Sequence, residues 1–162
     1  TSLFWDYKWM PVQFIGRTIK TGNIELDSLL NYKLDQADQL HIPVDLKVEV
    51  PENNVIEPFD LAVVIGNLFD NAIEALSNLP ESERHLELSI QYLKGCLLIH
   101  SSNPYQGEIL LHNGKIVTKK SDSALHGIGL NSIETTISKF NGELKISTEH
   151  SIFTIQILIY TN

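Results

Sequence analysis

The chain has 162 residues, which suits a single domain large enough to bury one good core. Hydrophobic residues make up 43% and charged residues 20%, a globular balance that argues against disorder. The net charge of −8 and the sequence pI of about 5.1 have the wrong sign for a protein that binds the nucleic-acid backbone. A phosphate ligand is still possible if backbone amides and a metal ion neutralise it.

The cysteine, histidine and hydropathy patterns argue against several further kinds of protein. Cys96 is alone, so no intramolecular disulfide forms and a reducing compartment is expected. No apolar run approaches the roughly 18 residues of a membrane span, and no signal-peptide pattern is present. No two histidines have the spacing of a zinc site, so a structural zinc site is not expected; the histidines are at 41, 85, 100, 112, 126 and 150.

The first half of the chain predicts two helices and a strand. Residues 1–20 show no period or cap, and we expect either a docked arm or the end of a longer upstream element. Leucines spaced by three and four, with Asn23 as a cap, predict a helix over about 25–40. The alternation in "HIPVDLKVEVP" predicts a strand that Pro51 ends, and a helical pattern follows over 59–78.

The second half is rich in strands. "LELSIQYL" and "CLLIHSS" predict a hairpin joined across Lys94-Gly95, and Asn113-Gly114 predicts a second, shorter hairpin within 108–120. "SDSALHGIGL" is expected to be a polar, glycine-bearing loop before a helix over 131–140 that ends at Asn141-Gly142. Two strands, "ELKIST" and "IFTIQILIY", close the chain. The order αβαβββαββ favours a two-layer α+β sandwich over a doubly wound parallel sheet.

The 59–78 helix carries an unusual polar ridge. At 100° per residue its apolar residues share one broad arc, and the opposite side holds Asp60, Asn67, Asn71, Glu74 and Asn78. A solvated face is one interpretation. Against it, asparagine costs helix propensity, and exposed positions usually hold Glu, Lys, Gln or Arg. An asparagine carbonyl suits a Mg²⁺ ion that phosphate oxygens already surround, because another carboxylate would repel the phosphates.

Three stretches together resemble the GHKL superfamily of ATP-binding domains. "NLFDNAIEAL" is similar to its N box, and "HGIGLNSIETTISKFNGELKI" to its second glycine box with the following helix and strand. "GNIELDSLLNYKLDQADQLHI" is similar to the first helix of the ATP-binding domain in the histidine kinases that include peptide quorum receptors. The resemblance spans about 20–160. It implies a two-layer α/β sandwich over 21–162, in which a mixed, mostly antiparallel sheet packs against about three helices.

The resemblance assigns roles along the ridge. The second asparagine of the N box coordinates Mg²⁺ in the family, which implies that role for Asn71. Hydrolysing members have a glutamate base where this chain has Asn67. Because an amide cannot take that proton, the chain is similar to the kinases rather than the hydrolases. Glu74 and Asn78 are expected to be surface or hydrogen-bonding residues rather than ligands.

The glycine box implies a phosphate site. Gly127 and Gly129 would allow close backbone approach, and exposed amides at a helix start favour a polyphosphate. His126 either contacts a phosphate or caps the loop. Lys119 and Lys120 are either phosphate contacts or a charged lid tip. The cofactor-binding set that the resemblance implies is Asn67, Asn71, Asn103, Lys119, Lys120, His126, Gly127, Ile128, Gly129 and Leu130.

The first glycine box departs from the family. Most members have Asp-x-Gly-x-Gly after the strand, and this chain has "SSNPYQG". Asn103 would take the place of the aspartate that accepts a hydrogen bond from the adenine amino group; an Asn-Pro turn is the alternative. The phenylalanine-containing box is missing and the stretch between the glycine boxes is short, which implies a reduced lid over ATP.

The resemblance implies the catalytic domain of a two-component sensor histidine kinase, with ATP and Mg²⁺ as cofactors. Its phosphoacceptor histidine would lie on a separate helical hairpin, because His41 is in the wrong place and 1–20 is too short for that hairpin. The expected partners are that hairpin, a response regulator and a second copy in the full-length protein, without nucleic acid or direct membrane contact. We expect a cytoplasmic fragment of a membrane-bound sensor. The alternatives are an anti-sigma-type serine kinase and a non-catalytic nucleotide-binding scaffold.

Overall fold

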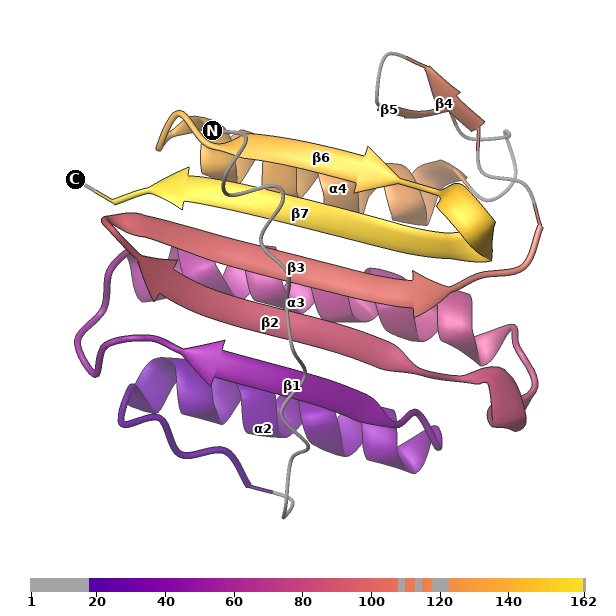
Figure 1. The fold of residues 1–162 in the computed structure, drawn as a ribbon, viewed down its shortest axis with the longest axis horizontal. Helices are drawn as coiled ribbons and strands as arrows, with labels where there is room; N and C mark the ends of the chain where they lie inside the picture. The colour runs from indigo at the N-terminus through magenta and orange to yellow at the C-terminus, as the bar shows by residue number, and fades with distance from the viewer. Residues whose placement is uncertain (1–17, 108–109, 113–114, 118–122, 162) are drawn as a thin grey trace.

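The computed structural model describes residues 18–107, 110–112, 115–117 and 123–161. One open five-stranded sheet forms the first layer, and three helices on one of its faces form the second (Figure 1). The helices are α2 (Ile24–Gln39), α3 (Pro58–Ser77) and α4 (Ser123–Ser138). This is the expected α+β sandwich. Among the described helices, none has both the length and the apolar composition needed to cross a membrane.

The sheet is mixed, with strand order β1-β2-β3-β7-β6. β1 (Val44–Glu49) and β2 (Leu86–Leu93) are parallel, because α3 carries the chain back across the sheet between them. The other neighbouring pairs are antiparallel and involve β3 (Cys96–Pro104), β6 (Glu143–Ser147) and β7 (Ile152–Tyr160). Short 3₁₀ turns precede β2 (Glu81–Glu83) and β7 (Glu149–Ser151).

The sequence signals that predicted the starts of α2 and α3 are confirmed. The Asn23 side chain accepts a hydrogen bond from the Leu26 amide at 3.1 Å and so caps α2. Pro58 stands in the first turn of α3, where its missing N–H leaves no hydrogen bond unmade. Just before α2, the backbone of Ile19 pairs with the Asn31 side chain at 2.7 and 3.1 Å. Residues 1–17 of the predicted arm lie outside the described residues.

Both hairpins form where they were predicted. Leu93 pairs with Cys96, and the two loop residues, Lys94 and Gly95, both have positive φ (52° and 77°), as a two-residue hairpin requires. β4 (Leu110–His112) and β5 (Lys115–Val117) pair antiparallel as a separate small ribbon. The observed order therefore has one strand more than αβαβββαββ, since the short hairpin contributes two.

The hydrophobic core fills the space between the sheet and the helices. In the five-stranded sheet, alternate residues of a strand point toward the helices, so the other strand residues lie on a face that no described helix covers (Figure 1). The largest fully buried side chains are Phe69, Leu26, Leu30, Ile65, Leu68, Leu76, Leu86, Leu88, Ile90, Leu97, Ile99 and Ile133. The core thus fixes α3 against the centre of the sheet.

α4 begins earlier than predicted. Its first residue is Ser123, whereas the sequence predicted a loop through residue 130 and a helix from residue 131. The two glycines in this stretch lower helix propensity, which is why a loop was expected; packing of α4 against α3 compensates for that cost. The predicted end at Asn141-Gly142 is confirmed: Asn141 has φ 51°, and the Gly142 amide donates to the Ile137 carbonyl at 2.9 Å.

Candidate functional site

Three residues of the polar ridge lie against α4 or the residue just after it: Asp60, Asn67 and Asn71. Asn67, Asn71 and Glu74 are half-buried, and only Asn78 near the end of α3 is exposed. α4 runs antiparallel to α3. Gly129, in the first half of α4, lies beside Asn71 in the second half of α3, whereas Lys139, just after the end of α4, reaches the first turn of α3. The asparagines that the sequence singled out therefore line an interface between two helices.

Gly129 is a point of close approach between the two helices. A Cβ atom added there would lie 3.0 Å from Asn71 Oδ1 and 3.4 Å from Asn67 Oδ1. A methyl group at 3.0 Å from an oxygen is too close, so only glycine lets α4 approach this near without displacing the asparagine. The N-box asparagines and the glycine box, far apart in sequence, are side by side in the fold.

An ion pair holds the other end of the two helices together. Lys139 Nζ, just beyond α4, lies 3.0 Å from Asp60 Oδ1 in the first turn of α3. The Asp60 side chain is only 10% exposed, whereas that of Lys139 is 56% exposed. The sequence placed Asp60 on the polar side correctly but gave no sign of its burial, because its partner is 79 residues away.

The amide groups of the ridge are oriented by the helix itself. Asn67 Nδ2 donates to the Val63 carbonyl one turn earlier at 2.7 Å, and Asn78 Nδ2 donates to the Glu74 carbonyl at 3.3 Å. With its nitrogen committed to the backbone, Asn67 presents its carbonyl oxygen toward Gly129. A neutral oxygen acceptor is thus fixed on the α4 side of the helix, and no acid–base group occupies that position.

Asn103 lies in the last part of β3 and is buried, with 3% of its surface exposed. Alternation along the strand places it with Leu97 and Ile99 on the helix-facing side of the sheet. Its Nδ2 donates to the Pro104 carbonyl at 2.9 Å. The start of β2 pairs with the last residues of β3, and the chain enters β2 from the C-terminal end of α3. Asn103 therefore lies at the end of the sheet that is nearest the C-terminal end of α3.

The remaining predicted residues are only partly described. His126, Gly127 and Ile128 lie within the first turns of α4, so the glycines are inside the helix rather than at its start. Leu130 packs against the core, and Gly129 is buried. The two predicted phosphate-binding lysines, 119 and 120, lie outside the described residues.

The residues of the candidate site are chemically suited to binding a nucleotide together with Mg²⁺. Amide oxygens from Asn67 and Asn71 are neutral ligands of the kind that Mg²⁺ tolerates beside phosphates. Gly129 brings backbone close to them without a side chain between, and Asn103 supplies a buried amide at the end of β3. No side chain in this described set can act as a base toward water, so the arrangement suits binding and positioning.

Comparison with known proteins identifies the family. The family model for the GHKL domain matches residues 56–160, which include α3, all strands from β2 onward and α4. The chain belongs to the GHKL family. No curated protein sequence matches the chain significantly. The N-box and glycine-box resemblance is thereby confirmed at the level of the family.

Solved structures give the same fold for this GHKL domain. The histidine kinase AdeS of Acinetobacter baumannii superposes with a TM-score of 0.60 at 17% identity, over 86% of this chain and 64% of that one. A nucleotide-free catalytic domain of the histidine kinase ThkA superposes with a TM-score of 0.64 at 15% identity, over 86% and 91%. A second ThkA form gives 0.65 at 16% identity, over 86% and 93%. The chain thus spans less than two thirds of AdeS and nearly all of the ThkA domain.

Proposed function

We propose that this GHKL domain is the ATP-binding catalytic domain of a two-component sensor histidine kinase. It transfers the γ-phosphoryl group of ATP to a histidine on a separate dimerisation domain. The observation that carries the proposal is the close approach of Gly129 to Asn67 and Asn71, which brings the glycine box and the N box together at one place. Membership of a family whose domains bind ATP, usually with Mg²⁺, supports it, as does the fold shared with histidine kinase catalytic domains.

Each side chain has a distinct part in the proposed site. Asn71 would hold the metal through its amide oxygen, and Asn67 would supply a second neutral oxygen from the same side of α3. The phosphates lie toward the start of α4 at Ser123, where the amides of the first turn have no carbonyl partner within the helix. Gly129 keeps α4 close to the two asparagines, and Lys119 and Lys120 add positive charge. Asn103 accepts a hydrogen bond from the adenine amino group in place of the aspartate found in most of the family.

The proposed chemistry depends on positioning. The acceptor imidazole nitrogen bonds to the γ-phosphorus while the bond from that phosphorus to its bridging oxygen breaks, so ADP leaves. Mg²⁺, when bound, neutralises the phosphate charge that develops in this step. The protein aligns the groups and offers no carboxylate base at Asn67, so water is not activated. Transfer to another protein group is therefore favoured over hydrolysis.

The proposed partners follow from this role. The acceptor hairpin of the parent kinase docks beside the nucleotide, and a response regulator takes the phosphoryl group from it. We place the domain in the cytoplasm, as part of a homodimeric, membrane-bound sensor. The likeness of the first helix to the quorum-receptor branch stays a prediction.

Isothermal titration calorimetry of the chain with ATP, with and without Mg²⁺, tests the proposal. We expect binding at micromolar or weaker affinity that strengthens when Mg²⁺ is present, because the ion links the phosphates to Asn71. ADP should also bind, since the adenine and α,β-phosphate contacts remain. No heat and no thermal shift with millimolar ATP or ADP would remove the proposed function.

A further inference from the structure

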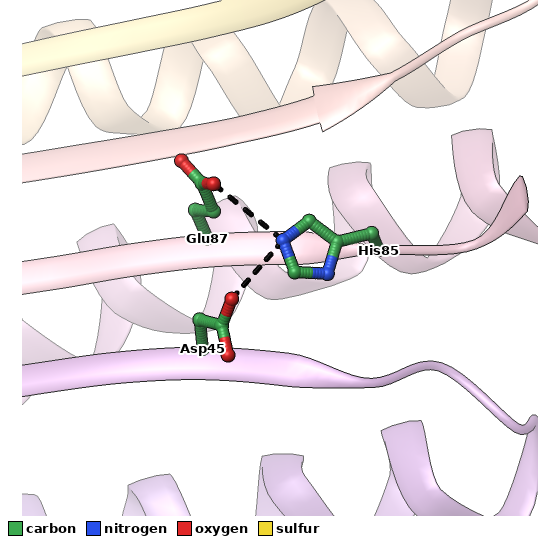
Figure 2. Close-up of side chains that lie close together, drawn as sticks. All are labelled: Asp45, His85 and Glu87. Carbon is green, nitrogen blue, oxygen red and sulfur yellow. Dashed lines mark ion pairs between the residues drawn. The ribbon is translucent and has the colours of Figure 1, made fainter. Parts of the chain in front are cut away.

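Three potential metal ligands meet on the sheet face opposite the helices. Asp45 on β1, Glu87 on β2 and His85 just before β2 converge there, as Figure 2 shows. His85 Nε2 lies 3.2 Å from Asp45 Oδ2 and 3.5 Å from Glu87 Oε1. Their neighbours Leu46, Leu86 and Leu88 point into the core, so alternation places the cluster on the far side from α3.

The strand register creates this cluster. Asp45 and Glu87 are direct partners in the parallel ladder of β1 and β2. Two carboxylates directly opposite each other destabilise a sheet unless a positive group lies between them. The His85 ring nitrogen points between the two carboxylates. The arrangement therefore provides one nitrogen and two carboxylate donors at a place where negative charge needs a counter-charge.

The distances suit a shared cation better than hydrogen bonds. One N–H cannot serve both oxygens well, because 3.2 Å is the long limit for such a bond and 3.5 Å exceeds it. Ligands about 2.1 Å from a tetrahedral ion are roughly 3.4 Å apart, close to both nitrogen–oxygen distances. All three ligand atoms lie within 4.8 Å of one another. Two ligands of one ion span at most about 4.2 Å, so the cluster has nearly the size of a coordination shell.

We propose that Asp45, His85 and Glu87 bind a divalent transition-metal ion, with Zn²⁺ the best match. An imidazole with two carboxylates is a donor set that zinc uses, whereas Mg²⁺ and Ca²⁺ take oxygen ligands. The three side chains are 42%, 33% and 36% exposed in the order His85, Asp45, Glu87, so water completes the coordination and the carboxylates have room to turn.

The ion would join an edge strand to its neighbour. β1 is at the edge of the sheet and pairs only with β2 among the described strands. A metal held by both strands adds a link that the unfolded chain lacks, so binding stabilises the fold. The site is on the opposite side of the sheet from the α3–α4 interface. It is therefore separate from the proposed nucleotide site and does not depend on it.

Thermal unfolding of the tag-free chain with ZnCl₂, in the absence of nucleotide, tests the site. At a hundredfold excess over Kd we expect the wild type to gain roughly 5–10 °C in Tm. Glu87→Gln keeps the side-chain shape but removes a charged ligand, and His85→Ala removes the nitrogen. Each should weaken zinc binding about tenfold or more. Co²⁺ in place of Zn²⁺ should give the strong visible absorption of tetrahedral cobalt, and both variants should lose it.

Glu143→Gln is the matched control. It makes the same change in charge on β6, at the other edge of the sheet, and should keep the full zinc response. His41→Asn removes an exposed histidine outside the cluster and should do the same. Zinc that fails to raise the Tm of the wild type overturns the proposal. So does a zinc response that survives unchanged in both Glu87→Gln and His85→Ala.

Discussion

Replacing Gly129 with alanine tests the close contact between the glycine box and the N box. Its Cβ would lie 3.0 Å from Asn71 Oδ1, so the asparagine or α4 must shift by a few tenths of an ångström. Overpacking of this kind typically costs about 1–3 kcal/mol. Alanine in a helix interior also contributes about 1 kcal/mol of stability relative to glycine, which offsets part of that cost.

Gly66→Ala separates the two effects. Gly66 lies in α3, beside the N box, and the nearest atom to its added Cβ is Lys33 Cε at 4.0 Å, an ordinary contact. The gain in helix propensity is the same in both variants, so it cancels in their difference. We expect Gly66→Ala to raise the free energy of unfolding by about 1 kcal/mol. Gly129→Ala should be about 1–3 kcal/mol less stable than Gly66→Ala.

Urea unfolding gives the stabilities, and calorimetry with Mg²⁺ and ATP gives the affinities. Displacing the Asn71 amide misplaces a proposed metal ligand, so Gly129→Ala should bind nucleotide about tenfold more weakly while Gly66→Ala binds normally. If Gly129→Ala is as stable as Gly66→Ala and binds as well as the wild type, the reasoning from close approach is refuted.

Three further changes probe the interface and the sheet. Asn71→Ala should weaken the binding of ATP with Mg²⁺. Its urea midpoint should stay near that of the control Asn78→Ala, because neither side chain is in the core. A lower midpoint together with full binding would indicate that Asn71 is a structural residue. Lys139→Ala should cost about 1–2 kcal/mol in urea unfolding by leaving the buried Asp60 carboxylate unpaired, and adding Asp60→Asn should recover part of it; no recovery would contradict the ion pair. Burial lowers the pKa of His100 below its ordinary 6.5, so the unfolded chain takes up the proton more readily and stability falls as pH drops below 6.5. His100→Gln should show a smaller fall over that range, and an equal fall would refute the assignment.

Much of the fold could be predicted because its signals are local. Asn23 as a cap, Pro58 in the first turn and the two-residue turn at Lys94-Gly95 each act over a few residues, and the structure confirms them. The start of α4 could not be predicted this way. Gly127 and Gly129 argue against a helix locally, and the contact with α3 that favours one is absent from the local pattern.

The candidate site likewise contains some residues that the local sequence pattern predicts and others that it does not. Asn67 and Asn71 stood out because asparagine is a poor choice for an exposed helix face, and they line the interface with α4. The ion pair of the buried Asp60 is with a lysine 79 residues away. The Asp45–His85–Glu87 cluster depends on a parallel register, so a search for paired histidines could not have revealed it. Contacts of this kind depend on topology rather than on spacing in the chain.

Transfer of label from [γ-³²P]ATP tests the central proposal most directly. The chain is incubated with Mg²⁺ and labelled ATP, alone and with the parent kinase's helical hairpin, and the products are treated with acid and base. We predict acid-labile, base-stable label on the hairpin and none on this chain, with very slow release of free phosphate because Asn67 cannot act as a base. Acid-labile, base-stable label on the chain itself, or no label on the hairpin while ATP is bound, would contradict the account.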